Sequence, residues 1–121
     1  MVDDDADDQF FFCDAINELN NGLKCTTAYN GIDALKKIEI PPPPDVIFLD
    51  LNMPVMNGFE FITVLQKDEK LKDIPVVIFT TSSSEHDKQK ALRLGAKHYI
   101  TKPTEFAKLK SMLTETLQAS Y

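Results

Sequence analysis

The chain has 121 residues, of which 43% are hydrophobic and 26% charged, so it fits one globular domain that can bury a core. Its formal net charge of −6 argues against direct binding to nucleic acid or to an anionic membrane, where a basic surface is needed. The sequence contains no apolar stretch of bilayer-spanning length and no signal peptide, so we predict a cytoplasmic protein.

The chain opens MVDDDADDQFFF, which places five aspartates between residues 3 and 8. The carboxylates within residues 5–8 are expected to begin a helix, because acidic side chains there cap free backbone N–H groups and favour the helix dipole. Apolar residues then recur at helical spacing as far as Leu19, and the turn-forming residues 20–22 predict the end of this helix.

Strands and helices alternate from residue 23 onward. The predicted strands span residues 23–28, 46–49, 74–79 and 98–101, and the predicted helices begin near residues 31, 59, 84 and 105. Four prolines at 41–44 cannot be helical and are expected to form a stiff extended connector. This alternation predicts parallel strands joined by right-handed helical crossovers, which is an open α/β sheet with helices on both faces.

The two cysteines, Cys13 and Cys25, lie in apolar-periodic segments and lack CxxC spacing. We predict that both are reduced thiols in or near the core of a cytosolic protein. A disulfide or a reactive thiol is the alternative.

The polar residues that follow the apolar runs should share one edge of the sheet, since chemistry in such folds gathers at the carboxyl ends of the strands. These residues are aspartates 3–5, Asp50, Thr80, Thr81 and Lys102. Clustered carboxylates suit Mg²⁺, which prefers hard oxygen ligands, and a further carboxylate can act as a nucleophile toward phosphorus. A hydroxyl and an ammonium can hold phosphoryl oxygens as negative charge accumulates. The pattern therefore predicts a site for a divalent metal and a phosphoryl group.

Three motifs extend this pattern to a family resemblance. They are VIFLDLNMPVMNG around Asp50, FTTS around Thr80 and YITKP around Lys102. Thr80 follows Asp50 by 30 positions and Lys102 follows Thr80 by 22. In these motifs and spacings, residues 1–121 resemble the receiver domain of two-component response regulators, in its stand-alone form similar to chemotaxis regulators.

The resemblance implies a flavodoxin-like fold: a doubly wound sheet of five parallel strands in the order 2-1-3-4-5, with helices on both faces. Only Met1 and Val2 precede the aspartates, whereas a strand in such a sheet usually has about five residues. We therefore expect a truncated first strand. A missing upstream segment of a few apolar residues is the favoured reason, and a strand that is only a stub is the alternative.

The resemblance also implies roles for individual residues. Asp50 would be phosphorylated. Asp3 and Asp4 match the family's metal-binding acidic pair, with Asp4 expected to bind Mg²⁺ directly and Asp3 through water. Asp50 itself would bind the metal, and Asn52 would contribute its backbone carbonyl.

Four further residues match the family's functional positions. Thr80 would donate a hydrogen bond to a phosphoryl oxygen, and Lys102 would pair with Asp50 or its phosphate. Tyr99 matches the aromatic residue that rotates inward when the threonine moves toward the phosphate. Pro103 matches a proline whose preceding peptide bond the family commonly holds in the cis form.

The implied function is phosphorelay signalling rather than enzymatic action on other molecules, since the domain would catalyse only its own phosphorylation and dephosphorylation. A sensor histidine kinase or a phosphotransfer protein would supply the phosphoryl group. The surface made by the helix near 84, the strand 98–101 and the helix near 105 would change shape and bind a downstream protein. A phosphorylation-dependent homodimer is compatible with that surface. We favour a stand-alone receiver over one excised from a longer chain.

Two other functions stay open. A haloacid-dehalogenase-like phosphatase also uses an aspartate after a buried strand, but it needs a second aspartate two residues later, where this chain has Asn52. The chain also lacks room for a cap domain. A degenerate receiver could act only as a protein-interaction module, although the presence of Asp50, Thr80 and Lys102 speaks against this alternative.

Overall fold

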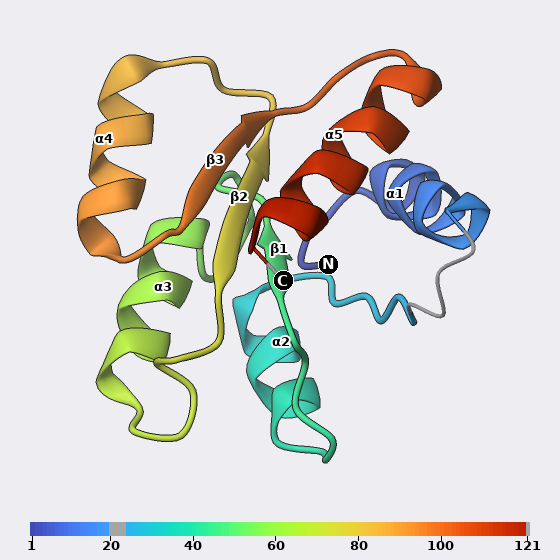
Figure 1. Cartoon of the computed structure of the whole chain (residues 1–121). Helices are drawn as coiled ribbons and strands as arrows, with labels where there is room; N and C mark the ends of the chain where they lie inside the picture. Colours follow the sequence, from blue (N-terminus) through green and yellow to red (C-terminus); the bar gives the residue numbers. More distant parts are fainter. Residues whose placement is uncertain (20–23, 121) are drawn as a thin grey trace.

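The computed structural model describes residues 1–19 and 24–120, which form a twisted parallel sheet with helices packed on both sides (Figure 1). The predicted helix end at 20–22 lies outside the described residues. In chain order the elements are α1 (Ala6–Glu18), α2 (Gly31–Ile38), β1 (Ile47–Leu49), α3 (Gly58–Lys67), β2 (Val76–Thr80), α4 (Glu85–Leu94), β3 (His98–Thr101) and α5 (Phe106–Ser120).

The sheet confirms the predicted order of neighbours, although its first two positions are very short. β1, β2 and β3 are parallel neighbours, and in their register Ile78 of β2 lies between Leu49 and Tyr99. Val2 lies beyond β1 and forms single parallel bridges to Leu49 on one side and to Ala28 on the other. The spatial order is therefore Ala28, Val2, β1, β2 and β3, which is the predicted 2-1-3-4-5 arrangement.

Val2 occupies the position of the first strand and pairs on both sides. Val2 donates its N–H to the carbonyl of Phe48 (2.8 Å), and its own carbonyl accepts the N–H of Asp50 (2.9 Å). Ala28 donates its N–H to the carbonyl of Met1 (2.9 Å) and accepts the N–H of Asp3 (3.0 Å). These first residues thus join both neighbours without a gap. Of the strand predicted at 23–28, only Ala28 forms a β-bridge within the described part, and the Met1 ammonium also donates to the carbonyl of Thr26 (2.7 Å).

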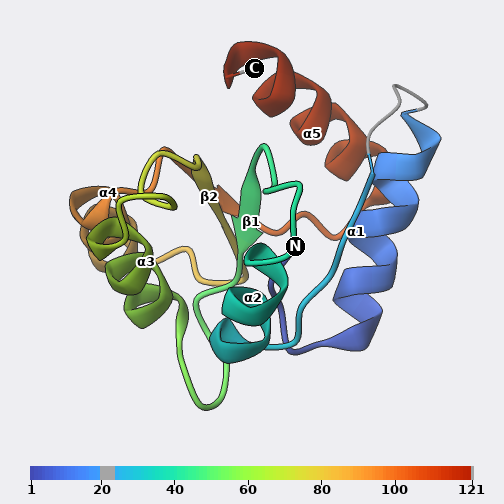
Figure 2. The same ribbon diagram turned by 90° about the horizontal axis from the view of Figure 1, so that it is seen from below.

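Two hydrophobic clusters lie on opposite faces of the sheet (Figures 1 and 2). One cluster is covered by α2, α3 and α4, and its largest fully buried side chains are Phe61, Ile62, Leu65, Leu49 and Ile78. The other is covered by α1 and α5, and its members include Phe12, Ile16, Phe48, Val77, Phe79, Leu109 and Leu113. Successive strand residues alternate between the two clusters, because side chains in a strand point to opposite faces.

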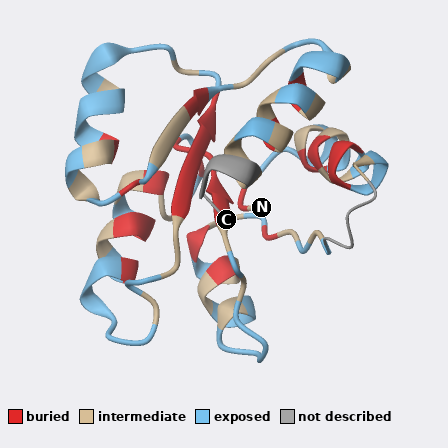
Figure 3. Ribbon diagram, in the orientation of Figure 1, coloured by how far each residue is buried: buried red, intermediate tan, exposed pale blue. Residues whose placement is uncertain are grey.

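Two neighbouring strands, β1 and β2, are buried along their whole length. All five residues of β2 are buried, and so are the three of β1 (Figure 3). Apolar runs without alternation are expected when helices cover both faces of a parallel sheet. The sequence prediction of an α/β sheet with both faces covered is therefore confirmed, and the bounds of β1, β2 and β3 differ from the predicted ones by at most two residues.

The predicted start of the first helix is also confirmed. The side chain of Asp5 is the N-cap of α1 and accepts the backbone N–H groups of Asp7 (2.9 Å) and Asp8 (3.0 Å). A second helix start close to the sheet edge is α3, where Asn57 and Glu60 form a reciprocal capping box. Within residues 1–19 and 24–120, no helix is both long and apolar enough to cross a bilayer.

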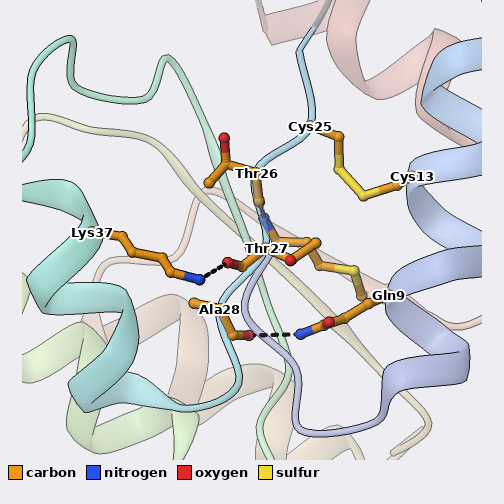
Figure 4. Close-up of a disulfide and its surroundings, with 8 residues drawn as sticks. Gln9, Cys13, Cys25, Thr26, Thr27, Ala28 and Lys37 are labelled. Carbon is orange, nitrogen blue, oxygen red and sulfur yellow. Dashed lines mark hydrogen bonds between the residues drawn. A yellow bond between two sulfur atoms is a disulfide. The ribbon is translucent and has the colours of Figure 1, made fainter.

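The prediction of two reduced cysteines is wrong, because Cys13 and Cys25 form a disulfide (Figure 4). Cys13 lies in α1, and the extended segment 24–28 runs beside that helix, which brings the two Cα atoms to 5.7 Å. That separation is within the usual range for a disulfide. The sequence could not show this approach, because it depends on how the chain returns past α1 to pair with the first strand.

Candidate functional site

The candidate site lies where the strands end at their carboxyl side, and the sheet itself places its backbone. Asp50 follows β1 and donates its N–H to the carbonyl of Val2 (2.9 Å). Lys102 follows β3 and donates its N–H to the carbonyl of Thr80 (2.7 Å), the last residue of β2. Four chain segments that are distant in sequence therefore meet at one edge.

Three carboxylates gather at this edge. Asp3, Asp4 and Asp50 each offer an oxygen, and these oxygens lie within 4.8 Å of one another. Asp3 is fully buried and Asp50 nearly so, whereas Asp4 is exposed. A set of hard oxygen donors with one solvent-facing member fits Mg²⁺, which binds through one or two carboxylates and keeps several waters. The three residues predicted to bind metal through their carboxylates are thus brought together.

Lys102 balances part of this negative charge. Its Nζ lies 2.7 Å from Oδ2 of Asp3 and 2.7 Å from Oδ2 of Asp8, but 3.7 Å from Oδ2 of Asp50. The predicted partner, Asp50, is therefore at ion-pair distance, while the short hydrogen bonds go to Asp3 and Asp8. The side chains of Lys102, Asp3 and Asp50 are at most 10% exposed, so the interactions of Lys102 with these two carboxylates are shielded from water.

Burial and ion pairing shift the pKa values of Asp3 and Lys102 in opposite directions. Burial raises the pKa of the Asp3 carboxyl, and the hydrogen bond from Lys102 opposes that rise. For Lys102, burial alone would lower the pKa, but its hydrogen bonds to Asp3 and Asp8 outweigh burial and leave the pKa raised. Lys102 is therefore a firmly protonated cation inside an acidic pocket.

Thr80 and Asn52 are the remaining predicted residues of the site. Thr80 is fully buried, and its Oγ1 accepts the N–H of Ser82 at 3.4 Å. Asn52 is exposed, and its backbone N–H lies 3.5 Å from Oδ1 of Asp50. The contacts to the two Asp50 oxygens are thus long, so this carboxylate is held less tightly than that of Asp3.

The predicted switch residue Tyr99 is connected to Thr80 through one loop residue. Tyr99 is half-buried against the cluster under α2, α3 and α4, and its hydroxyl donates to the carbonyl of Ser82 (2.8 Å). Ser82 also donates its N–H to Thr80 Oγ1 (3.4 Å), so this one loop residue contacts both side chains. The expected cis bond before Pro103 is wrong: among the described residues, the only cis bond is Pro41–Pro42.

Two residues at the site were missed by the sequence reasoning. Asp8 was assigned only to the helix start, yet it binds Lys102. Gln9 is 6% exposed, and its side-chain amide donates to the carbonyls of Asp3 (2.7 Å) and Ala28 (2.9 Å). The sequence pattern that could have revealed Gln9 is its position on the same apolar face of the helix as Phe12 and Ile16, where a polar residue is unusual. Its amide ties α1 to the acidic turn.

The loop after Asp50 is tightly packed against that residue. A Cβ built on Gly58 would lie 2.6 Å from the carbonyl oxygen of Asp50 and 2.8 Å from Cα of Leu51. The N–H of Gly58 donates to the carbonyl of Leu51 (3.0 Å). The glycine that ends the motif VIFLDLNMPVMNG therefore lets α3 begin directly against the backbone of the site.

Comparisons with known proteins agree with this geometry. Protein-glutamate methylesterase/protein-glutamine glutaminase of Clostridium acetobutylicum is 36% identical over 126 residues, covering 100% of this chain but only 36% of that protein. PilH of Pseudomonas aeruginosa is 37% identical over 107 residues, covering 87% of this chain and 85% of PilH. The chain thus spans about a third of one relative and most of the other.

A similar solved structure is that of the phosphorylated cyanobacterial phytochrome response regulator RcpA. It superimposes with a TM-score of 0.87 at 28% identity, covering 97% of this chain and 88% of RcpA. A model of the response regulator receiver domain family matches residues 1–114. The chain therefore belongs to the response regulator receiver domain family, whose members act in phosphorelay signalling.

Proposed function

We propose that this chain receives a phosphoryl group on Asp50 in an Mg²⁺-dependent reaction and thereby switches a protein-binding surface. The observation that carries the proposal is the gathering of Asp3, Asp4 and Asp50 within 4.8 Å, with the Lys102 ammonium 3.7 Å from Asp50. A nucleophilic carboxylate, metal-binding carboxylates and a cation are the groups that phosphoryl transfer to an aspartate needs.

In the proposed step an oxygen of Asp50 attacks the phosphorus of a phosphorylated histidine. The new bond is O–P, the bond that breaks is P–N, and the imidazole leaves with the electron pair and takes up a proton. With a small donor such as acetyl phosphate, a P–O bond breaks and acetate leaves. Asp50 suits this role because the contacts of its oxygens with described residues, to Asn52 and Lys102, are long.

The metal would be held by the carboxylates of Asp3, Asp4 and Asp50 and by the backbone carbonyl of Asn52. When bound, Mg²⁺ supplies positive charge that offsets the charge on the phosphoryl oxygens. Asp4 is the better candidate for direct binding. Both oxygens of Asp3 already have partners, since Oδ1 accepts the N–H of Asp5 (3.0 Å) and Oδ2 accepts Lys102, whereas Asp4 faces solvent.

Thr80 and Lys102 would hold the phosphoryl oxygens. The Thr80 hydroxyl is a donor that can rotate, and its present contact with Ser82 is long at 3.4 Å, so little is lost when it turns toward a phosphate. The raised pKa of Lys102 keeps it protonated, and an ammonium is a strong donor to phosphate.

The switch would pass through Ser82. When Thr80 turns to the phosphate, the loop that holds the Tyr99 hydroxyl changes its contacts, and Tyr99 can rotate inward. The affected surface consists of α4, β3 and α5. This surface would have two alternative packing arrangements. The phosphate favours the arrangement in which Thr80 contacts it, because the other arrangement lacks that contact.

We further infer the partners from this chemistry. A sensor histidine kinase or a phosphotransfer protein supplies the phosphoryl group, and a downstream protein binds the switched surface, on which a phosphorylation-dependent homodimer would also form. The chain would act as one receiver domain over residues 1–121. Its only catalysis would be its own phosphorylation and dephosphorylation.

Intact-mass measurement after incubation with acetyl phosphate tests the proposal. The wild-type chain should gain the mass of one phosphoryl group when Mg²⁺ is present and none when the metal is chelated. Asp50→Asn should gain nothing. A degenerate receiver would stay unmodified under all conditions, and a phosphatase would release inorganic phosphate from added phosphomonoesters over many turnovers. Equal labelling of wild type and Asp50→Asn would refute Asp50 as the acceptor.

A further inference from the structure

The ammonium of Lys102 makes its short contacts away from the proposed phosphoacceptor. It lies 2.7 Å from Asp3 and 2.7 Å from Asp8, and 1.0 Å farther from Asp50. An ammonium has three N–H donors, so these two carboxylates occupy two of them. Asp8 is not one of the strand-end carboxylates, because it belongs to the first turn of α1.

We propose that Asp8 is a positioning residue that holds Lys102 back from Asp50 and competes with the phosphoryl group for the ammonium. This inference rests on the proposed function, since it assumes that Lys102 binds the phosphoryl group. In this arrangement Asp8 lowers the affinity of the pocket for a phosphoryl group and shortens the lifetime of the phosphorylated state.

The exposures of the two carboxylates identify Asp8 as the partner that yields. The Asp3 side chain is 0% exposed, and burying an unpaired carboxylate there is costly. The Asp8 side chain is 40% exposed, so water can replace Lys102 when the ammonium leaves. Release from Asp8 therefore costs less than release from Asp3, and a phosphoryl group on Asp50 should draw Lys102 away from Asp8 first.

The backbone of α1 holds Asp8 in place. The Asp8 N–H is capped by Asp5 (3.0 Å), and the next residue, Gln9, is buried and bonded to the carbonyls of Asp3 and Ala28. One turn further on, Phe12 packs against Phe48 and Phe79. The carboxylate of Asp8 is thus presented to Lys102 from a fixed helix turn.

The reciprocal effect follows from thermodynamic linkage. If Asp8 weakens phosphoryl binding, phosphoryl binding weakens the Lys102–Asp8 pair by the same factor. The start of α1 would then lose its contact with Lys102 in the phosphorylated state. The unphosphorylated and phosphorylated states would differ at α1 as well as on the surface of α4, β3 and α5.

Asp7 provides a matched control for Asp8. It lies in the same helix turn and carries the same charge, but it is exposed, and it makes no hydrogen bond or ion pair with Lys102 within the described residues. Asp7→Asn and Asp8→Asn therefore remove equal charge from the neighbourhood of the metal site, and only Asp8→Asn removes the partner of Lys102.

The test measures the affinity for beryllofluoride, a phosphoryl mimic, by isothermal titration calorimetry in saturating Mg²⁺. Asp8→Asn should bind it about fivefold more tightly than wild type, and Asp7→Asn should not. Titration with Mg²⁺ alone should show a similar small loss of affinity in both variants. Asp8→Glu, which keeps the charge, should return toward wild type. A general structural defect would lower the affinity for both beryllofluoride and Mg²⁺ rather than raise the affinity for one of them.

The outcomes separate this inference from the proposed function. If wild type binds beryllofluoride and Asp8→Asn binds it no more tightly than Asp7→Asn, the role of Asp8 is refuted while the phosphoacceptor site stands. If neither wild type nor Asp7→Asn binds beryllofluoride, the proposed function fails and the role of Asp8 fails with it. Thermal melts of each variant verify that the chain is folded.

Discussion

Replacing Lys102 by methionine tests whether the acidic pocket depends on its internal cation. Methionine has a similar length but no charge, so Lys102→Met leaves Asp3, Asp8 and Asp50 without the ammonium that lies within 3.7 Å of each. Asp3 suffers most because it is 0% exposed and cannot turn to solvent.

The expected loss follows from these burials. Removing one partner of a fully buried ion pair typically costs about 3–5 kcal/mol. Here the 40% exposure of Asp8 lets one carboxylate recover its hydration, so the lower end applies and the loss should be about 3 kcal/mol. For a domain of this size such a loss lowers Tm by about 10 °C.

Urea unfolding followed by circular dichroism, with and without Mg²⁺, measures this loss. A metal at about 100 times its Kd should add about 2.7 kcal/mol to the folded state. The gain should be larger in Lys102→Met than in wild type, because Lys102 no longer competes for Asp3. A loss below about 1 kcal/mol, or an equal gain from Mg²⁺ in both proteins, would refute the reasoning.

Three further predictions concern the packing around the site. Gly58→Ala should lose about 1–3 kcal/mol in urea unfolding, because its Cβ would lie 2.6 Å from the Asp50 carbonyl oxygen; a change under about 0.5 kcal/mol would contradict this close contact. Reduction of the Cys13–Cys25 disulfide, which has a sequence separation of 12, should lower the free energy of unfolding by about 3 kcal/mol, measured by thermal melting. The same reducing agent should leave the stability of a Cys13→Ser variant unchanged. The hydrogen bond from the Tyr29 N–H lowers the pKa of the Asp33 carboxyl, so at neutral pH the wild type should be more stable than Asp33→Asn. This difference in the free energy of unfolding, measured in urea, should disappear as the pH falls well below 3.8. A difference that persists there would contradict the role of the hydrogen bond.

The strand-end residues were predictable because two simple patterns coincide in them. Asp50 and Thr80 each follow an apolar run that is buried on both faces, and parallel strands bring their carboxyl ends to one edge. Lys102 follows β3, which is only partly buried, so its prediction rested more on the motif YITKP than on burial. The helix start at Asp5 was predictable because capping is a local interaction.

The remaining features depend on contacts that local patterns do not encode. Asp8 had a sufficient local explanation as a helix-start residue, and its partner Lys102 is 94 residues away. The disulfide depends on the path of segment 24–28 beside α1. The second strand was overpredicted at 24–27 because β propensity says nothing about whether a partner strand is long enough to pair with it.

The central claim is that Asp50, and not a neighbouring carboxylate, carries the phosphoryl group. The direct measurement is to phosphorylate the wild-type chain with acetyl phosphate and Mg²⁺, trap the acyl phosphate with borohydride, and locate the reduced residue by peptide mass spectrometry. We predict reduction at Asp50, with Asp3, Asp4 and Asp8 unmodified. Reduction at any of those three residues, or at none of the four, would contradict the account.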